Sequence, residues 1–210
     1  MFLWTAGALA GTVCKTANIL GFADAAPDVR LVRARALRCA GARKRLGAEL
    51  AIKVALSSAI ALAVFFVASF AASSTGAVFR PGAWYANLRK PKWTPPNWAF
   101  PVVWTVLFCA IAVSGWLVWE TAGVEAWPAL ALFAAHLLVN SVWSFLFFGL
   151  KRLDWAMIEV VMLWLMIAAV ITAFAPISVT AALLLAPYLA WVSVAALLNL
   201  RLLQLNGPRG

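Results

Sequence analysis

The sequence predicts an all-α membrane protein, built as a bundle of five transmembrane helices with a folded loop between the first two. Apolar residues make up 65% of the 210 residues and charged residues only 11%, more apolar surface than a soluble domain of this size can bury. Five runs reach the roughly 20 apolar residues that a helix needs to cross a bilayer. These runs are about twice as long as the strands of a membrane barrel and do not alternate polar with apolar residues. A single helical bundle is therefore the expected fold.

The five expected spans have short connectors after the second and fourth, which favours antiparallel neighbours in one bundle. Pro101 and Pro128 fall at the starts of the second and third spans, where a missing N–H costs little. Pro187 lies inside the fifth span, where an interior proline frees a carbonyl and tends to kink the helix. The expected spans are 54–72, 99–119, 129–150, 155–175 and 179–202.

The chain before the first span differs from the rest. Residues 28–45 are rich in Arg and Ala and nearly free of acidic residues, a composition typical of a transit peptide or a basic amphipathic arm. Residues 1–21 are interrupted by polar side chains and predict a poor spanning helix. A start assigned too early, with the true start nearer Glu49, is the alternative interpretation. We therefore expect an extension of unassigned role at 1–48 and the transmembrane domain at 49–206.

The formal net charge of +10 does not indicate nucleic-acid binding, because of where the charges lie. Nine of the 17 Lys and Arg residues lie in the first 53 positions, and four more lie in the loop at 73–98. Basic residues that flank a span usually set its topology and meet anionic headgroups. The loop, the connector at 151–154 and the C-terminus are expected on one side, whereas the opposite connectors at 120–128 and 175–178 hold no basic residue. This count predicts that the loop faces the cytoplasm, although the basic residues of the N-terminal arm favour the opposite orientation.

The loop before the second span combines proline with tryptophan. Residues 84–101 hold too many prolines for a helix and too many tryptophans for a solvated loop, so they predict a folded cap at the water boundary of the membrane. A single Trp near the end of a span usually belongs to the interfacial belt. Rings gathered on one side instead favour stacking and edge contacts with a planar guest. Four rings crowd onto this loop and the span it enters: Trp84, Trp93, Trp98 and Trp104.

Two spans carry polar and aromatic residues at helical spacing. In the third span, His136, Asn140 and Trp143 lie on nearly one face. His136 has no second ligand at a metal-binding spacing, so we expect an interhelical hydrogen bond there rather than a metal. In the fifth span, one stripe joins four residues at spacings of three and four: Tyr188, Trp191, Ala195 and Asn199.

Residues for acid–base or nucleophilic catalysis are not arranged in any catalytic pattern. No two carboxylates have the spacing of a general acid and base, and the single histidine has no orienting acid for a Ser–His or Cys–His set. The three cysteines offer no pair with metal-ligand or redox spacing. The sequence therefore gives no support for hydrolytic or metal catalysis.

Taken in order, these residues resemble the signature of the TspO/MBR family of tryptophan-rich sensory proteins, which includes the mitochondrial translocator protein or peripheral benzodiazepine receptor. The run W-Y-x-x-L-x-K-P-x-W-x-P-P is followed by F-P-x-x-W, N-x-x-W, F-F-G and P-Y-x-x-W. The resemblance covers roughly residues 53–206. The five motifs begin at Trp84, Phe100, Asn140, Phe147 and Pro187.

The resemblance implies a five-helix bundle, usually a homodimer in the lipid bilayer, with a pocket beneath the loop. Such pockets bind porphyrins, haem, and benzodiazepine- or isoquinoline-type drugs, so the resemblance implies a tetrapyrrole ligand and no obligatory cofactor or metal. The pocket residues that it implies for this chain are Trp84, Tyr85, Trp93, Pro96, Trp104, Asn140, Trp143, Tyr188, Trp191 and Ala195.

Three functions are compatible with these residues in an integral, multi-pass membrane protein. The first is tetrapyrrole binding for transport or sensing, with the propionates at the basic boundary around Arg89, Lys90 and Lys92. The second is an enzyme that degrades porphyrin with light or oxygen, which the family match at Trp104 and Trp191 implies. The third is a membrane signalling or interaction partner regulated by its ligand.

One family feature is missing from this chain. Mammalian members carry a cholesterol motif near the end of the fifth helix, with an aromatic residue after the asparagine and a basic residue a few positions later. Here Leu200 follows Asn199, so the pattern fails, and such motifs are weak indicators even when intact. Cholesterol is therefore a doubtful ligand.

Overall fold

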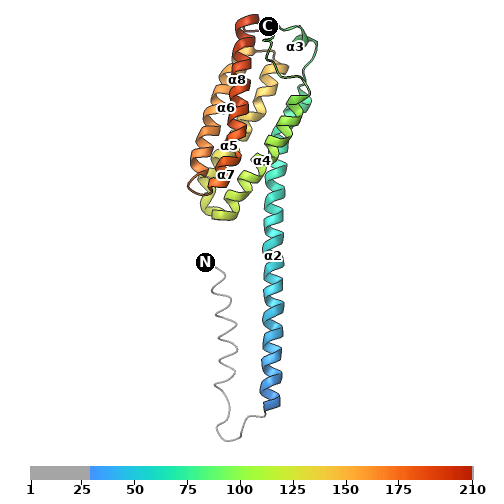
Figure 1. The fold of residues 1–210 in the computed structure, drawn as a ribbon, viewed down its shortest axis with the longest axis vertical. Helices are drawn as coiled ribbons and strands as arrows, with labels where there is room; N and C mark the ends of the chain where they lie inside the picture. Colours follow the sequence, from blue (N-terminus) through green and yellow to red (C-terminus); the bar gives the residue numbers. More distant parts are fainter. Residues whose placement is uncertain (1–28, 210) are drawn as a thin grey trace. The chain divides into compact units, whose positions relative to one another are not determined.

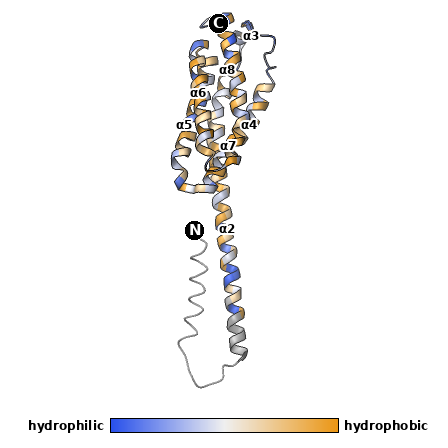
Figure 2. Ribbon diagram, turned by 60° about the vertical axis from the view of Figure 1, so that its left-hand side comes forward, coloured by the Kyte–Doolittle hydropathy of each residue, from blue (hydrophilic) through white to orange (hydrophobic). Residues whose placement is uncertain are grey.

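The computed structural model describes residues 29–209, and within that range every regular element is a helix. Four helical segments are long and apolar enough to cross a membrane, so the predicted all-α, multi-pass membrane fold is confirmed (Figure 1). The apolar character extends along the helices of the bundle (Figure 2). The four segments are Ala40–Val78, Ala99–Gly149, Leu153–Phe174 and Val179–Asn206.

The second of these segments contains two of the predicted spans. A straight helix of its 51 residues would be about 75 Å long, more than twice a bilayer core of about 30 Å. Instead, α4 (Ala99–Ala122) ends in a short 3₁₀ turn at Gly123–Ala126, and α5 (Trp127–Ser144) returns in the opposite direction (Figure 1). Gly123 has φ +56°, a left-handed conformation that glycine adopts without steric cost. Residues 29–209 thus contain five helical spans that are long and apolar enough to cross a membrane, as predicted.

The first span belongs to a longer helix than predicted. Helix α2 runs over Val29–Val78, whereas the sequence predicts a span at 54–72. The helix continues on both sides because no proline occurs in this range and Ala, Leu, Arg and Lys all favour helix. The chain divides at residue 58 into two compact units, and the bundle is the second of them. Residues 1–28, including the segment predicted as a poor spanning helix, lie outside the described residues, and the predicted boundary at 48/49 stays a prediction.

The loop after α2 contains a short helix, α3 (Ala83–Asn87). The expectation that 84–101 is free of helix is therefore wrong at its start, because no proline occurs between Gly82 and Pro91. Tyr85 and Leu88 are buried in an apolar cluster with residues of the bundle, so the loop is folded onto it as a cap. Burial raises the pKa of the Tyr85 phenol, which keeps the group neutral at physiological pH.

The remaining helices complete the core. After α5, a π-helical turn at Phe145–Gly149 leads to α6 (Leu153–Phe174). The fifth span is interrupted at one residue, Leu185, between α7 (Val179–Leu184) and α8 (Ala186–Asn206). The first turn of α8 contains Pro187, so the interruption lies where the proline was expected to disturb the helix. The main core lies between α4, α5, α6, α7 and α8, and its most buried members include Ile111, Phe133, Ile167, Phe174 and Tyr188.

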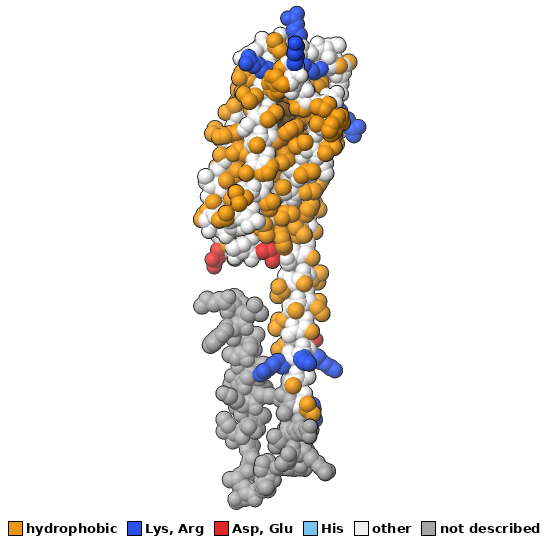
Figure 3. Space-filling view, in the orientation of Figure 1, with side chains coloured by type: hydrophobic (Ala, Val, Ile, Leu, Met, Phe, Trp, Pro, Cys, Tyr) orange, Lys and Arg blue, Asp and Glu red, His pale blue; other side chains and the backbone are white. Residues whose placement is uncertain are grey.

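The C-terminus, the loop and the start of α6 meet at one end of the bundle. The Leu153 N–H donates to the Pro208 carbonyl oxygen (2.9 Å), and the Asn206 amide bonds both backbone groups of Arg89. Figure 3 shows Lys and Arg side chains gathered at this end and acidic side chains at the other. The predicted placement of these three segments on one side is confirmed, while the cytoplasmic orientation stays a prediction.

Candidate ligand-binding site

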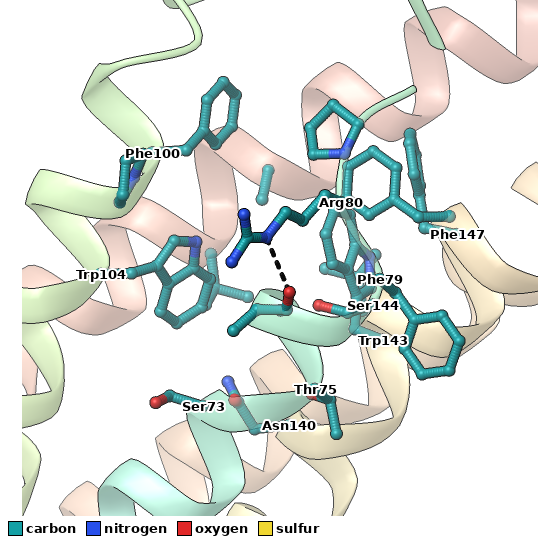
Figure 4. Close-up of a pocket in the computed structure, with 18 of the residues that line it drawn as sticks. Ser73, Thr75, Phe79, Arg80, Phe100, Trp104, Asn140, Trp143, Ser144 and Phe147 are labelled. Atoms are coloured by element: carbon teal, nitrogen blue, oxygen red, sulfur yellow. Dashed lines mark hydrogen bonds between the residues drawn. The ribbon is translucent and has the colours of Figure 1, made fainter. Parts of the chain in front are cut away.

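A cavity of about 710 Å³ lies in the bundle, beneath the loop that follows α2. Its volume falls within the ~300–1,000 Å³ typical of small-molecule sites. The wall is formed by the C-terminal part of α2, by α4, α5, α6 and α8, and by residues of the loop (Figure 4). Aromatic and aliphatic side chains dominate, with a few polar groups among them. That mixture is characteristic of pockets that enclose an apolar ligand and orient it through a few polar contacts.

Three tryptophans from three different helices line this cavity: Trp104 on α4, Trp143 on α5 and Trp191 on α8. Helical spacing places each of the first two beside a phenylalanine four residues later. The phenylalanine contacts restrict the orientation of every indole. The centroid distances are 5.4 Å for the stacked pair Trp104–Phe108, 4.7 Å for the stacked pair Trp143–Phe147 and 6.0 Å for the edge-on pair Trp191–Phe100.

Asn140 contributes a polar group to the cavity wall, and a hydrogen bond to Tyr188 holds its side chain in place. The Asn140 side-chain amide donates to the Tyr188 hydroxyl oxygen (2.7 Å). Tyr188 is fully buried and does not line the cavity, whereas Asn140 does. The ring of Tyr188 also contacts that of Trp104 edge-on, at 6.0 Å between centroids. Tyr188 therefore positions cavity residues and does not face a ligand itself.

Some polar atoms of the wall residues have no hydrogen-bond partner. These buried atoms are the indole Nε1 of Trp143, the indole Nε1 of Trp191, and both amide atoms of Asn199. A buried polar group without a partner costs roughly 1–3 kcal/mol. Each of these residues lines the cavity, so a guest with polar atoms could supply the missing bonds after a small side-chain rotation.

Arg80 is the one charged residue among those that line the cavity. Its Nε donates to the Ala77 carbonyl oxygen (2.7 Å) (Figure 4). Sequence reasoning counted Arg80 only toward topology and missed it as a site residue. The signal that could have indicated it is its position at the end of the first apolar run, immediately before Pro81.

The basic residues expected to meet the ligand lie elsewhere. Arg89, Lys90 and Lys92 are absent from the cavity wall. The Lys90 ammonium lies 4.3 Å from the centroid of the Tyr85 ring and donates to the Ala86 carbonyl oxygen (3.2 Å). Arg89 and Lys92 are exposed and Lys90 is half-buried. The sequence pattern does not specify how the loop folds over the bundle, and therefore does not specify which of its side chains reach the cavity.

The structure brings together six of the ten residues predicted for the pocket and leaves out four. Trp93 is 50% exposed, and the Trp84 indole N–H donates to the Arg209 carbonyl oxygen (3.2 Å); neither lines the cavity. Sequence reasoning missed several wall residues, including Phe79, Phe100, Phe147 and Asn199. The six that line the cavity are Tyr85, Trp104, Asn140, Trp143, Trp191 and Ala195, and the four that do not are Trp84, Trp93, Pro96 and Tyr188.

The buried ionisable residues His136 and Glu159 are not part of the cavity wall. His136 Nδ1 bonds the Phe133 carbonyl oxygen of its own helix, so the expectation of an interhelical hydrogen bond is wrong. The carbonyl three residues earlier lies within reach of the ring and takes the contact. Among the side chains that the structure describes, no three of His, Cys, Asp or Glu lie close enough to hold a metal ion.

Five helices able to span a membrane, with an aromatic cavity under the first interhelical loop, place the chain among multi-pass helical membrane proteins. The sequence profile of the TspO/MBR family matches residues 57–205, and the chain belongs to that family.

Three similar proteins support the assignment of the chain to this family. Over 146 residues the chain is 42% identical to Protein CrtK of Rhodobacter capsulatus, covering 69% of this chain and 91% of the relative. It is 39% identical over 145 residues to the tryptophan-rich sensory protein of Cereibacter sphaeroides (69% and 90% covered). It is 40% identical over 129 residues to the translocator protein of Ovis aries (60% and 76% covered). The family resemblance seen in the sequence is thus confirmed.

Proposed function

We propose that this protein binds a planar tetrapyrrole, a porphyrin or haem, in the cavity beneath the loop, for transport or sensing. The observation that carries the proposal is the convergence of Trp104, Trp143 and Trp191 on one cavity of about 710 Å³. A flat macrocycle presents extended apolar faces, against which indole rings stack or make edge contacts favourably. The names of two relatives, a tryptophan-rich sensory protein and a translocator protein, agree with a sensing or transport role. The family resemblance also supports a homodimer as the assembled form.

The test is a binding titration with protoporphyrin IX, followed by the shift of its Soret absorption. Removing two stacking surfaces in a Trp104→Ala/Trp191→Ala double variant should weaken binding tenfold or more, since each ring contributes about 0.5–1.5 kcal/mol beyond its buried area. A Trp104→Phe/Trp191→Phe variant keeps aromatic surface and should lose less. The matched control is Trp127→Ala/Trp155→Ala, because both rings are more than half exposed and lie off the cavity wall. An unchanged affinity in the first variant would remove the proposal.

A second candidate is light-dependent breakdown of the bound porphyrin. It is favoured by one observation: Trp104 and Trp191, the two rings assigned to this activity by family resemblance, both line the cavity. Illumination of the complex separates the two functions. Bleaching faster than in detergent alone, and lost in the Trp104→Phe/Trp191→Phe variant, supports breakdown. Bleaching at the detergent rate supports binding alone.

A further inference from the structure

We infer that Arg80 makes the cavity selective for ligands that carry a carboxylate beside a planar apolar body. This inference rests on the proposed function, because it names the chemical class that the same cavity accepts. A neutral ligand of the same shape would bind less well. The argument uses the charge of the wall, the geometry of the guanidinium and its surroundings.

The charge of the cavity wall comes from Arg80 alone. All other lining residues are uncharged, and no acidic side chain is among them. No ion pair of Arg80 occurs among the described side chains, where Arg152 pairs with Asp154, so Arg80 has no carboxylate partner in the described part of the chain. A guanidinium keeps its charge at physiological pH. Arg80 is exposed to solvent in this structure, and its attraction to an anion would strengthen as an apolar ligand displaces the water around it. An anionic group on the ligand would supply the missing counter-charge.

The backbone of α2 holds the Arg80 side chain in place. Ala77 lies in the last turn of α2, where carbonyl groups lack intrahelical partners and carry the negative end of the helix dipole. The Ala77 carbonyl oxygen accepts from Nε of Arg80 (2.7 Å), and this contact uses one of the five N–H donors of the guanidinium. The other four, on the two Nη atoms, have no partner in the described residues. Two of them form the fork that binds a carboxylate through parallel hydrogen bonds.

The surroundings of Arg80 indicate what the rest of the ligand looks like. Figure 4 shows the guanidinium reaching into the space between the side of the cavity that carries Trp104 and the side that carries Phe147. Phe79 and Phe100 also line this region. A ligand held by Arg80 therefore places the atoms next to its carboxylate among aromatic rings. A planar body with a short carboxylate arm fits this arrangement better than a flexible lipid chain does.

The experiment compares protoporphyrin IX with its dimethyl ester, which has the same macrocycle and no carboxylate. Both are titrated into the full-length protein in a neutral detergent. In Arg80→Gln, affinity for the acid should fall about tenfold to a hundredfold, the range expected for hydrogen bonds to a charged group, while affinity for the ester should change less than twofold. Arg80→Lys keeps the charge without the fork and should give an intermediate loss for the acid. Lys92→Gln, an exposed residue off the cavity wall, should leave both affinities unchanged.

Several results would overturn the inference. Equal losses for acid and ester in Arg80→Gln would mean that Arg80 only shapes the loop. Full acid binding by Arg80→Gln, together with a loss of phosphatidylglycerol binding in the same variant, would assign Arg80 to a lipid phosphate instead. If the wild type binds acid and ester equally and Arg80→Gln loses neither, selectivity fails while the proposed function stands. If the wild type binds neither compound, the proposed function itself fails.

Discussion

At the scale of single residues, the Asn140–Tyr188 pair links the cavity wall to the core. Among the described residues, the hydrogen-bond partner of the Asn140 side-chain amide is the buried Tyr188 hydroxyl. Tyr188→Phe removes that oxygen and leaves a buried N–H unsatisfied, so we expect a loss of about 1 kcal/mol, at the level measured for hydrogen bonds between membrane helices. The thermal unfolding midpoint in detergent should fall by a few degrees.

Ser141→Ala is the matched control for this prediction. Its hydroxyl donates to the Leu138 carbonyl oxygen of its own helix, near the surface, so its removal should leave the midpoint nearly unchanged. Equal midpoints for the wild type and Tyr188→Phe would contradict the role given to this pair.

The sequence allowed part of the site to be predicted at this scale. Trp104, Asn140, Trp143 and Trp191 could be identified because motif and helical spacing both place them on inward faces. Trp93 is predicted among the rings that face a guest but does not line the cavity, since local pattern does not determine how a loop folds back over a bundle. Arg80 was missed because a basic residue at the end of a span is normally a topology signal.

At the scale of elements, the end of α8 fastens the loop over the cavity. Asn206 accepts from the Arg89 N–H (2.8 Å) and donates to the Arg89 carbonyl oxygen (3.0 Å). Asn206→Ala removes both bonds, and we expect the loop to open more often. Hydrogen–deuterium exchange of loop peptides covering 83–97 should become faster, because local opening exposes their backbone amides.

Gln204→Ala provides the comparison for the loop experiment. Gln204 is exposed and its side chain accepts from Arg201 on the same helix, so exchange in the loop should stay at the wild-type rate. Exchange in 83–97 that does not respond to Asn206→Ala would show that the apolar contacts of Tyr85 and Leu88 hold the loop without help.

The helices themselves were predicted closely where apolar runs have clear ends. The spans expected at 99–119 and 155–175 correspond to α4 and α6, with ends that differ by only a few residues. The differences arise where a local feature outweighs the apolar pattern. α2 extends because a run without proline has no stop signal, and the fifth span is interrupted at Leu185 because Pro187 disturbs the helix there.

At the scale of the whole molecule, the distribution of charge predicts how the bundle sits in its membrane. The loop, the α5–α6 connector and the C-terminus share one basic end, while Glu120 and Glu125 lie at the opposite turn. By the positive-inside rule, the basic end should face the cytoplasm. Single cysteines at Lys92, Arg209 and Glu125, placed in a cysteine-free background, would report this orientation.

A membrane-impermeant maleimide added to intact cells should label Glu125→Cys and spare Lys92→Cys and Arg209→Cys. Labelling of the last two only after lysis completes the expected pattern. If Lys92→Cys and Arg209→Cys were labelled from opposite sides, the five-span topology would be contradicted. If both were labelled in intact cells, the topology would stand with the orientation reversed.

The most direct test of the account is an experimental structure of the protein solved with zinc protoporphyrin. We expect the macrocycle beneath the loop, in contact with Trp104, Trp143 and Trp191, with one propionate at the Arg80 guanidinium. Density for the macrocycle on the lipid-facing surface, or against Trp93 and Trp98 outside the loop, with the cavity left empty, would contradict it.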